Sequence, residues 1–250
     1  MENKVNQIVN WLQVKVREAG AKGLVVGLSG GLDSAVVAYL IKRACPNASM
    51  AVTMPLKSNP RDIEDALKVI DSSGINHVQI DLTETHQILF EHIQDQLQSK
   101  GEWVEGNRQL GDANLRARLR MSSLYTIATN YNYLVVGTDN ASEWYTGYFT
   151  KYGDGGVDLL PIVPFTKGDV FEMARYLGVP QSIIEKQPSA DLWEGQTDEI
   201  EMGTTYDKID AYLKGKAIPD KDKEIIETMH KRTEHKRLPI SQFKLPKDSM

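Results

Sequence analysis

The sequence is poor in cysteine and has no long apolar run. Cys45 is the only cysteine among 250 residues, so the chain can form neither an internal disulfide nor a zinc site built on paired cysteines. The N-terminal stretch MENKVNQIVNWLQ lacks the continuous apolar core of a signal peptide. No apolar run approaches the ~20 residues that span a bilayer. We therefore expect a cytoplasmic protein that does not enter a membrane.

Basic residues are also fewer than acidic residues. Lysine and arginine together number 29, against 34 aspartates and glutamates, which gives a net charge of −5 at pH 7. No long basic stretch offsets this balance, so we expect no nucleic-acid partner. The remaining composition, 41% hydrophobic and 25% charged, is ordinary for a globular protein. The length suits one large domain, residues 1–250, with a core of its own.

Apolar residues mark short strands that alternate with longer helices. The predicted strands are 24–28, 50–54, 77–82 and 133–136. The predicted helices are 3–19, 33–44, 61–70, 85–97, 112–129, 169–177, 181–186, 206–213 and 221–231, with irregular chain at 99–111, 139–168 and 187–203. Such strands pair in parallel through right-handed crossovers. The prediction is an α/β fold, a three-layer open parallel sheet of about five strands with helices on both faces.

The stretch LVVGLSGGLDSAVVAYL, residues 24–40, joins a predicted strand to a predicted helix. A Walker loop needs a lysine after its last glycine, where this chain has Leu32 and Asp33. A dinucleotide fingerprint fails too, because Ser29 stands where its second glycine is required. A third interpretation is a loop that holds pyrophosphate through backbone amides and hydroxyls, without a cation of its own.

Physical chemistry favours this third interpretation. Gly30 and Gly31 let the backbone approach a bulky anion, and the first amides of the following helix point toward it. Ser29 and Ser34 can donate hydroxyl hydrogens. Asp33 would repel phosphates unless a divalent cation lay between them, so it predicts Mg²⁺. The alternative is a glycine-rich turn in which Asp33 only caps the helix.

The six residues S-G-G-L-D-S resemble the signature of the ATP pyrophosphatases, which cleave ATP between the α and β phosphates. The resemblance implies an adenine nucleotide alpha hydrolase-like fold and an adenylation reaction. It implies that ATP is bound by Gly27, Leu28, Ser29, Gly30, Gly31, Leu32, Asp33 and Ser34. It does not identify the group that is adenylated.

Later segments resemble the NAD synthetase family. They are NLRARLRM (114–121), VVGTDNASEWYTGYFTKYGDGGVDLLPI (135–162), FTKGD (165–169), PSADLWEGQTDEIEMGTTYDKID (188–210) and TEHKR (233–237). The resemblance covers nearly the whole chain, and the block TGYFTKYGDGG is its most specific part. It implies the last step of NAD biosynthesis, in which the carboxylate of deamido-NAD is adenylated by ATP and then amidated by ammonia. The products are NAD, AMP and pyrophosphate.

The family implies roles for residues outside the opening loop. Glu143 would partner Asp33 as the second Mg²⁺ ligand, and Lys167 would supply the cation that the loop lacks. Thr138 and Ser189 would contact ATP. Asp33, Glu143 and Lys167 are therefore the predicted catalytic residues. Without the family, Glu143 would read as a solvated helix acid and Lys167 as a surface charge.

The second substrate has its own implied residues. The family implies that deamido-NAD is bound by Arg118, Lys151, Asp158, His235 and Lys236. Three cations suit a dinucleotide diphosphate, whereas His235 taken alone would be an exposed histidine of the tail. The family also implies a homodimer, with this site formed near the interface by both chains.

The chain departs from the family in two places. Its loop MPLKSNPRDIEDA (54–66) differs from the usual pattern, which leaves the adenosine contacts open, with Arg61 as a guess. Trp144 and Tyr145 stand where smaller residues are common and could reshape the acyl pocket. Segments 56–61 and 187–203 are the candidates for loops that order over ATP.

Two further expectations concern the source of the amide nitrogen and the alternative functions of the chain. The chain carries no glutaminase domain, so we expect direct use of free ammonia, with a separate glutaminase partner left open. The alternatives are another ATP pyrophosphatase, such as a tRNA-modifying enzyme, and a non-catalytic ATP-binding module. The lack of a basic surface argues against the first, and the pair of metal carboxylates argues against the second.

Overall fold

A four-stranded parallel sheet forms the centre of the molecule. The computed structural model describes residues 1–56, 58–188 and 197–245. Its strands are β1 (Gly23–Gly27), β2 (Ser49–Thr53), β3 (Asn76–Gln79) and β4 (Tyr133–Val136), in the spatial order β3-β2-β1-β4. Every neighbouring pair is parallel, as the alternation of strands and helices predicts.

Beyond the four strands, the sheet gains one isolated bridge. Leu159 pairs in parallel with Val136 at the free edge of β4, and no described residue extends this pairing into a ladder. Pro161 follows two residues later and has no N–H to donate, so the pairing ends there. The described sheet therefore has four strands, where about five were predicted.

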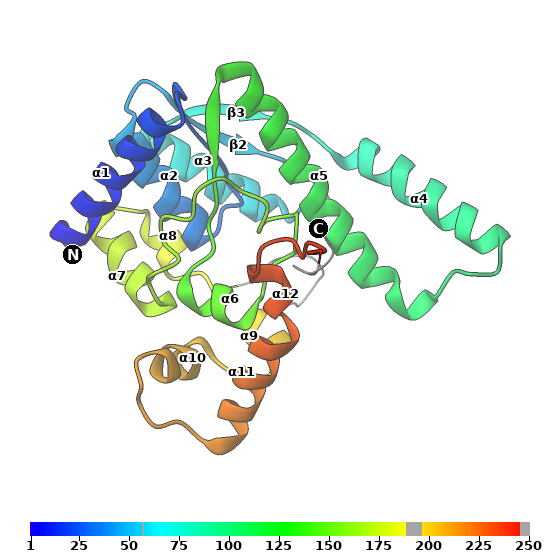
Figure 1. Cartoon of the computed structure of the whole chain (residues 1–250). Helices are drawn as coiled ribbons and strands as arrows, with labels where there is room; N and C mark the ends of the chain where they lie inside the picture. The colour runs from blue at the N-terminus through cyan, green and yellow to red at the C-terminus, as the bar shows by residue number, and fades with distance from the viewer. Residues whose placement is uncertain (57, 189–196, 246–250) are drawn as a thin grey trace.

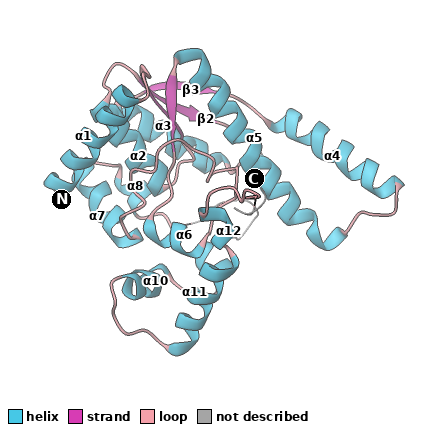
Figure 2. Ribbon diagram, in the orientation of Figure 1, coloured by secondary structure: helices cyan, strands magenta, loops and turns pink. Residues whose placement is uncertain are grey.

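Helices cover both faces of the sheet (Figures 1 and 2). Side chains alternate along β1, so that Leu24 and Val26 join one core and Val25 joins the other. The first core is built with α1 (Glu2–Glu18), α2 (Leu32–Ala44), α3 (Pro60–Ser73), α7 (Lys167–Leu177) and α8 (Gln181–Ile184). The second core is built mainly with α5 (Arg108–Tyr131). These layers confirm the predicted three-layer α/β fold.

Two groups of helices extend away from this body. Helix α4 (Thr83–Ser99) and the first half of α5 form a projecting arm, joined through the short helix η1 (Glu105–Asn107) (Figure 1). The segments α9 (Asp198–Met202), α10 (Tyr206–Leu213) and α11 (Asp220–Arg232) form a small satellite core around Ile209 and Ile226. The last described helix is α12 (Glu234–Arg237). None of the described helices is long and apolar enough to cross a membrane.

Several helices differ from the sequence prediction. α6 (Ala141–Thr146) lies in a segment predicted to be irregular, and α9 lies in a predicted loop. Both are short, so they depend on their N-caps more than on apolar periodicity. Asn140 forms a capping box with Glu143, and Thr197 accepts a hydrogen bond from the backbone N–H of Ile200. α5 begins at Arg108, four residues before the start of the predicted helix 112–129.

Candidate active site

A large cavity lies at the carboxyl ends of the parallel strands. Its volume is about 760 Å³, and the loops that follow β1, β2 and β4 line it, together with parts of α5 and α7. Ligands bind at this edge of parallel α/β sheets because the loops and helix N-termini converge there. Within the described part of the projecting arm, α4 contributes no residue to the cavity wall, whereas Leu110, Ala113, Asn114 and Ala117 from the first half of α5 line it.

The loop after β1 is folded tightly against its neighbours. Gly30 has a φ of +84°, and a Cβ atom there would lie 2.2 Å from the carbonyl oxygen of Asp62. Glycine is therefore required at this position. The backbone N–H of Gly31 donates to Ser29 Oγ over 3.2 Å, and Ser34 Oγ donates to the Gly31 carbonyl over 3.0 Å. This loop leads into the N-terminus of α2, a place that favours anions.

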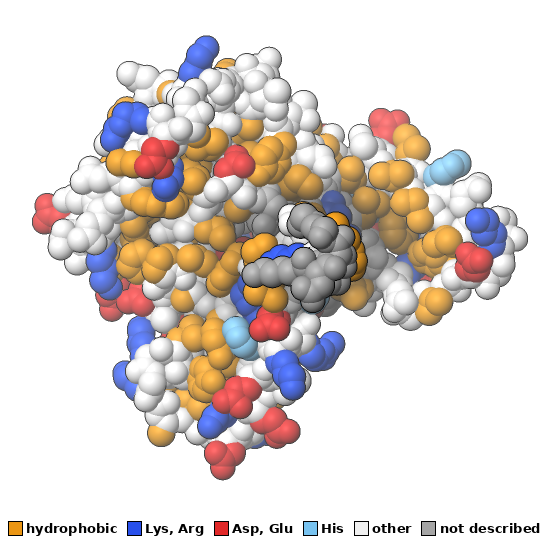
Figure 3. Space-filling view, in the orientation of Figure 1, with side chains coloured by type: hydrophobic (Ala, Val, Ile, Leu, Met, Phe, Trp, Pro, Cys, Tyr) orange, Lys and Arg blue, Asp and Glu red, His pale blue; other side chains and the backbone are white. Residues whose placement is uncertain are grey.

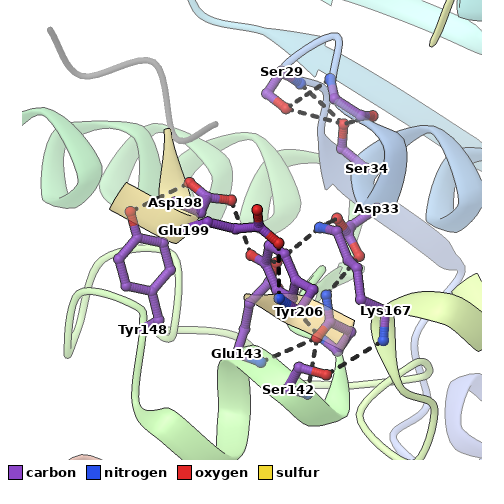
Figure 4. Close-up of polar contacts among 12 residues, drawn as sticks. Ser29, Asp33, Ser34, Ser142, Glu143, Tyr148, Lys167, Asp198, Glu199 and Tyr206 are labelled. Carbon is purple, nitrogen blue, oxygen red and sulfur yellow. Dashed lines mark hydrogen bonds and ion pairs between the residues drawn. The ribbon is translucent and has the colours of Figure 1, made fainter. Parts of the chain in front are cut away.

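Lys167 joins the two predicted metal carboxylates (Figure 4). Its Nζ lies 2.5 Å from Asp33 Oδ2 and 3.0 Å from Glu143 Oε1. The three residues come from α7, α2 and α6, and Lys167 is only 3% exposed. The Nδ2 of Asn140 donates to Asp33 Oδ1 over 2.9 Å, which fixes the carboxylate from its other side. The structure thus brings together the three predicted catalytic residues.

The N-terminus of α7 is held by residues that the sequence did not single out. Asp210, from α10, accepts hydrogen bonds from the backbone N–H groups of Gly168 (2.8 Å) and Lys167 (3.3 Å). The hydroxyl of Ser142 donates to the same carboxylate over 2.6 Å. A carboxylate at a helix N-terminus is favourable, because it meets unpaired N–H groups and the positive end of the helix dipole. Asp210 and Ser142 therefore set the position of Lys167.

Tyr206 is a further residue that sequence reasoning missed. Its hydroxyl lies 3.1 Å from Glu143 Oε1 and 2.9 Å from Asp198 Oδ2, and its ring centroid lies 4.7 Å from Lys167 Nζ (Figure 4). Burial, followed by the charge of Glu143, raises the pKa of the Tyr206 hydroxyl well above its ordinary value. The neutral phenol can therefore donate to these carboxylates. The acidic segment DEIEMGTTYD (198–207) was the only hint of this contact.

Negative charge is concentrated at this end of the cavity. Burial and the charge of Asp33 raise the pKa of Glu143 to about 7, although Lys167 opposes the shift. Burial alone would lower the pKa of Lys167, but Asp33 and Glu143 outweigh it and raise this pKa. Asp139 is 4% exposed, and within the described residues its Oδ2 has no hydrogen-bond partner. Burial, with Asp154, Glu143 and Asp33 nearby, raises the pKa of Asp139 well above its ordinary value.

This excess of carboxylates fits a divalent cation. Asp33 and Glu143 are hard oxygen donors on separate elements, as Mg²⁺ prefers. The described residues contain no group of three or more protein ligands arranged around one metal position. Mg²⁺ typically takes one or two carboxylates and completes its shell with water and phosphate oxygens. The donor set therefore suits a metal that arrives with ATP.

Other residues predicted to bind ATP line the same cavity, and their contact with ATP stays a prediction. Gly27, Leu28, Leu32 and Thr138 line the cavity. Ser189 lies outside the described residues.

Arg61 also lines the cavity, whereas Trp144 and Tyr145 do not. Trp144 stacks on Phe149 with ring centroids 5.1 Å apart, and Tyr145 stacks on His230 at 4.0 Å.

Four of the residues predicted for deamido-NAD lie together around one loop. Arg118 donates to the Lys151 carbonyl at 3.3–3.4 Å, and Lys151 Nζ donates to the His235 carbonyl at 2.6 Å. Lys236 Nζ donates to the Gly147 carbonyl at 2.7 Å and lines the cavity.

The fifth, Asp158, has structural partners. It accepts from Tyr125 Oη (2.9 Å) and from the backbone N–H of Val135 (2.8 Å), which ties it to α5 and β4. Its contact with a substrate ribose stays a prediction.

The fold and the site define the class of protein. A parallel α/β sheet that carries an S-G-G-L-D-S loop, with a lysine between two carboxylates beside it, is the arrangement of an ATP pyrophosphatase.

Comparison with known proteins gives the particular family. The family profile described as NAD synthase matches residues 4–240, and the chain belongs to this family. The NH(3)-dependent NAD(+) synthetase of Alkaliphilus oremlandii (strain OhILAs) is 55% identical over 237 residues, which are 95% of each chain. An NMN synthetase structure from Francisella tularensis has a TM-score of 0.89 and 41% identity, and the match covers 98% of both chains. An NH3-dependent NAD synthetase from Campylobacter jejuni subsp. jejuni has a TM-score of 0.76 and 28% identity over 97% of this chain and 98% of that one.

Proposed function

We propose that the chain is an ammonia-dependent NAD synthetase. It uses ATP to amidate deamido-NAD, and it releases NAD, AMP and pyrophosphate. The observation that carries this proposal is the Asp33–Lys167–Glu143 cluster, which lies beside the pyrophosphate loop in one cavity. The match of residues 4–240 to the NAD synthase family and the NH(3)-dependent NAD(+) synthetase of Alkaliphilus oremlandii support the choice of reaction.

The reaction has two steps. A carboxylate oxygen of deamido-NAD attacks the α-phosphorus of ATP, the bond to the bridging oxygen of the β-phosphate breaks, and pyrophosphate leaves. The nitrogen of ammonia then attacks the acyl carbon of the resulting mixed anhydride, AMP leaves with the bonding electrons, and the nitrogen loses a proton. The first step brings two anions together, so neutralisation and positioning dominate the barrier.

The buried cluster meets this need. Asp33 and Glu143 keep Lys167 charged although it is buried, and the N-terminal contacts of α7 fix its ammonium at the cavity wall. Lys167 thereby presents a fixed positive charge where the triphosphate approaches the substrate carboxylate. We assign Asp33 and Glu143 as ligands of Mg²⁺, which when bound neutralises phosphate charge and orients the phosphorus that is attacked.

The second substrate is assigned to the group formed by Arg118, Lys151, His235 and Lys236. Their contacts surround the segment 147–151, and Lys236 connects this group to the cavity that holds the catalytic cluster. Cations suit the diphosphate of a dinucleotide. This arrangement would place the pyridine carboxylate inside the cavity and the rest of deamido-NAD outside it.

We also propose a homodimer formed through the projecting arm. Ile88, Leu89 and Ile93 of α4 and Leu110 of α5 are exposed, with Ile88 at 62% and Leu110 at 61%. Figure 3 shows hydrophobic side chains gathered along this arm. An exposed apolar surface of this kind typically marks a protein interface. A second copy would cover it and bring its own arm close to Arg118, which lies on the same helix as Leu110.

The mononucleotide is a second candidate substrate. The solved structure with the TM-score of 0.89 is an NMN synthetase, and an amidation that forms NMN would use the same cluster and loop. The two functions differ in whether the site must also hold an adenylate half of the acceptor. Arg118 and Lys151 do not line the cavity. Cations in this position could bind the diphosphate of a dinucleotide, so they favour deamido-NAD over the mononucleotide.

One assay separates these functions. Purified protein is incubated with ATP, Mg²⁺ and ammonium, together with either deamido-NAD or nicotinic acid mononucleotide, and the products are quantified. We expect NAD, AMP and pyrophosphate in equal amounts, with a kcat/KM for deamido-NAD at least tenfold above that for the mononucleotide, a difference of about 1.4 kcal/mol. A preference for the mononucleotide would replace the proposal by the second candidate, and release of ADP would refute both.

The nitrogen source and domain organisation follow from the same proposal. We propose that residues 1–250 form a single synthetase domain that takes free ammonia, in the cytoplasm. In the assay above, glutamine should not replace ammonium. Equal rates with the two nitrogen donors would contradict this assignment.

A further inference from the structure

The leaving pyrophosphate needs positive charge that the cluster around Lys167 does not supply. Pyrophosphate is a strong anion, and phosphate sites usually combine backbone amides with lysine or arginine. The loop Ser29–Ser34 contains neither lysine nor arginine. Lys167 is buried and is already held by Asp33 and Glu143 at the other side of the loop.

Lys186 lines the same cavity as the loop and pairs with carboxylates other than those of the cluster around Lys167. It follows α8, and its Nζ forms ion pairs with Asp62 and with Asp65, the second over 3.2 Å. Its side chain is 31% exposed, so the ammonium can reach a ligand in the cavity that it lines. The charges of Asp62 and Asp65 outweigh the effect of burial and raise the pKa of Lys186, so it stays a cation.

The backbone brings this ammonium next to the pyrophosphate loop. The carbonyl oxygen of Asp62 lies so close to Gly30 that a side chain there could not fit. The same residue, Asp62, pairs with Lys186 through its carboxylate. Ser29, Gly31, Asp62 and Lys186 all line one cavity. Asp62 therefore lies between Lys186 and the loop and contacts both. The lysine side chain has four rotatable bonds, so its ammonium can change position.

We infer that Lys186 is a binding residue for the β- and γ-phosphates of ATP and for the pyrophosphate that leaves. Asp62 and Asp65 hold its ammonium at the edge of the cavity, and the phosphates draw it toward the loop when ATP binds. The site would then neutralise ATP from two sides, with Lys167 near the phosphorus that is attacked and Lys186 near the leaving group. This inference rests on the proposed function, because it assigns the leaving group of that reaction.

The chain contains a matched control for a purely structural role. Lys68, one turn after Asp65 on α3, pairs with the same carboxylate over 2.8 Å. Lys68 does not line the cavity. If Lys186 only neutralised Asp65, its loss and the loss of Lys68 would have the same consequence. Arg61, which is exposed and also lines the cavity, is the competing cation.

Calorimetric titration with Mg²⁺-pyrophosphate tests the inference, with AMP as the second ligand. We expect Lys186→Met to weaken pyrophosphate binding about tenfold or more, as loss of a charge-assisted hydrogen bond predicts. Lys186→Arg should restore most of the affinity, and Lys68→Met should stay within about twofold of wild type. AMP should bind all of these variants equally. In turnover, Lys186→Met should raise the KM for ATP and the inhibition constant of pyrophosphate, and leave the KM for deamido-NAD unchanged.

Four outcomes would overturn the inference. They are wild-type pyrophosphate affinity in Lys186→Met, an equal loss in Lys68→Met, an equal loss of AMP binding, and a loss that appears in Arg61→Met alone. Failure of the proposed function would look different. Wild-type protein would then bind pyrophosphate as expected but would form no NAD from deamido-NAD.

Discussion

At the scale of the residue, one buried ammonium organises the site. Lys167 contacts a carboxylate from α2 and another from α6, so a single side chain links the pyrophosphate loop to the loop after β4. The opening motif lacks the lysine of a Walker loop, and the ammonium that pairs with its Asp33 comes from a position 134 residues later in the chain. Asp33 was predicted from the chemistry of its loop, whereas Glu143 and Lys167 were predicted only through the resemblance to the NAD synthetase family. Tyr206 and Asp210 were missed, because no local pattern shows which distant residue a side chain will contact.

Asp33→Asn should abolish adenylation and preserve the fold. The amide removes a negative charge that Mg²⁺ and Lys167 both need, so we expect kcat to fall by about 10²-fold or more. Loss of one charged hydrogen bond should cost about 1–3 kcal/mol of stability, because Lys167 keeps its contact with Glu143. Turnover and thermal unfolding measure the two effects separately. A variant with near-normal turnover would show that the metal assignment is wrong.

Glu143 should make the stability of the metal-free protein depend on pH. Its pKa is about 7 in the folded state, above the ordinary value near 4.5 that we expect when the chain is unfolded. The folded state then binds more protons between these two values, so stability falls as pH rises through this window. Between pH 5 and pH 8 the loss should be of the order of 3 kcal/mol or less.

Denaturant unfolding in the presence of EDTA checks this dependence. Glu143→Gln resembles the protonated carboxyl, so its unfolding free energy should fall less over the same range than that of wild type, although Asp139, whose pKa is also raised, keeps its own contribution. If this variant and wild type lost stability in parallel, another group would be responsible.

At the scale of the element, short helices position the site more than long ones. α6 carries Glu143 and Ser142, and it exists because Asn140 and Glu143 form a capping box at its N-terminus. The sequence predicted the long helices of the body, whose apolar spacing repeats over several turns. It missed α6 and α9, which span 6 and 5 residues and are too short for a repeat to appear. The four strands that the sequence located are all present, and the only further pairing beside β4 among the described residues is a single bridge at Leu159, before Pro161.

Asp210→Ala should loosen the start of α7 and lower kcat. The carboxylate accepts from two backbone N–H groups and from Ser142, so its removal leaves buried donors without their acceptor. We expect a loss of about 1–3 kcal/mol of stability and, because Lys167 is misplaced, a fall in kcat of about tenfold or more. The KM for deamido-NAD should not change, since Asp210 lies away from that group. A change confined to stability would show that Asp210 does not position Lys167.

At the scale of the whole molecule, the arm and the body have different tasks. The body holds the sheet, the pyrophosphate loop and the catalytic cluster, and its architecture could be predicted from the alternation of strands and helices. For the arm, the sequence predicted the helices but not their role. The same apolar spacing occurs in helices that pack into a core and in helices that form an interface. Ile88 and Ile93 are exposed and so do not belong to the core, and the proposed interface rests on this exposure.

Ile88→Asp combined with Ile93→Asp should convert the dimer to a monomer. Both side chains lie on α4 away from the body, so the monomer should keep its fold and its melting temperature within a few degrees. Light scattering coupled to size-exclusion chromatography measures the mass of each form. A surface substitution at Gln98 of the same helix, which is exposed, provides the control. A wild-type mass of one chain, or a double variant that stays dimeric, would refute the proposed interface.

The central claim is that this cavity transfers AMP to a carboxylate, and an isotope measurement tests it most directly. Deamido-NAD labelled with ¹⁸O in its pyridine carboxylate is converted with ATP and ammonium, and the AMP is analysed by mass spectrometry. The account predicts one ¹⁸O atom in the phosphate of each AMP and none in pyrophosphate, because the carboxylate oxygen attacks the α-phosphorus. Unlabelled AMP, or ¹⁸O in inorganic phosphate released with ADP, would contradict it.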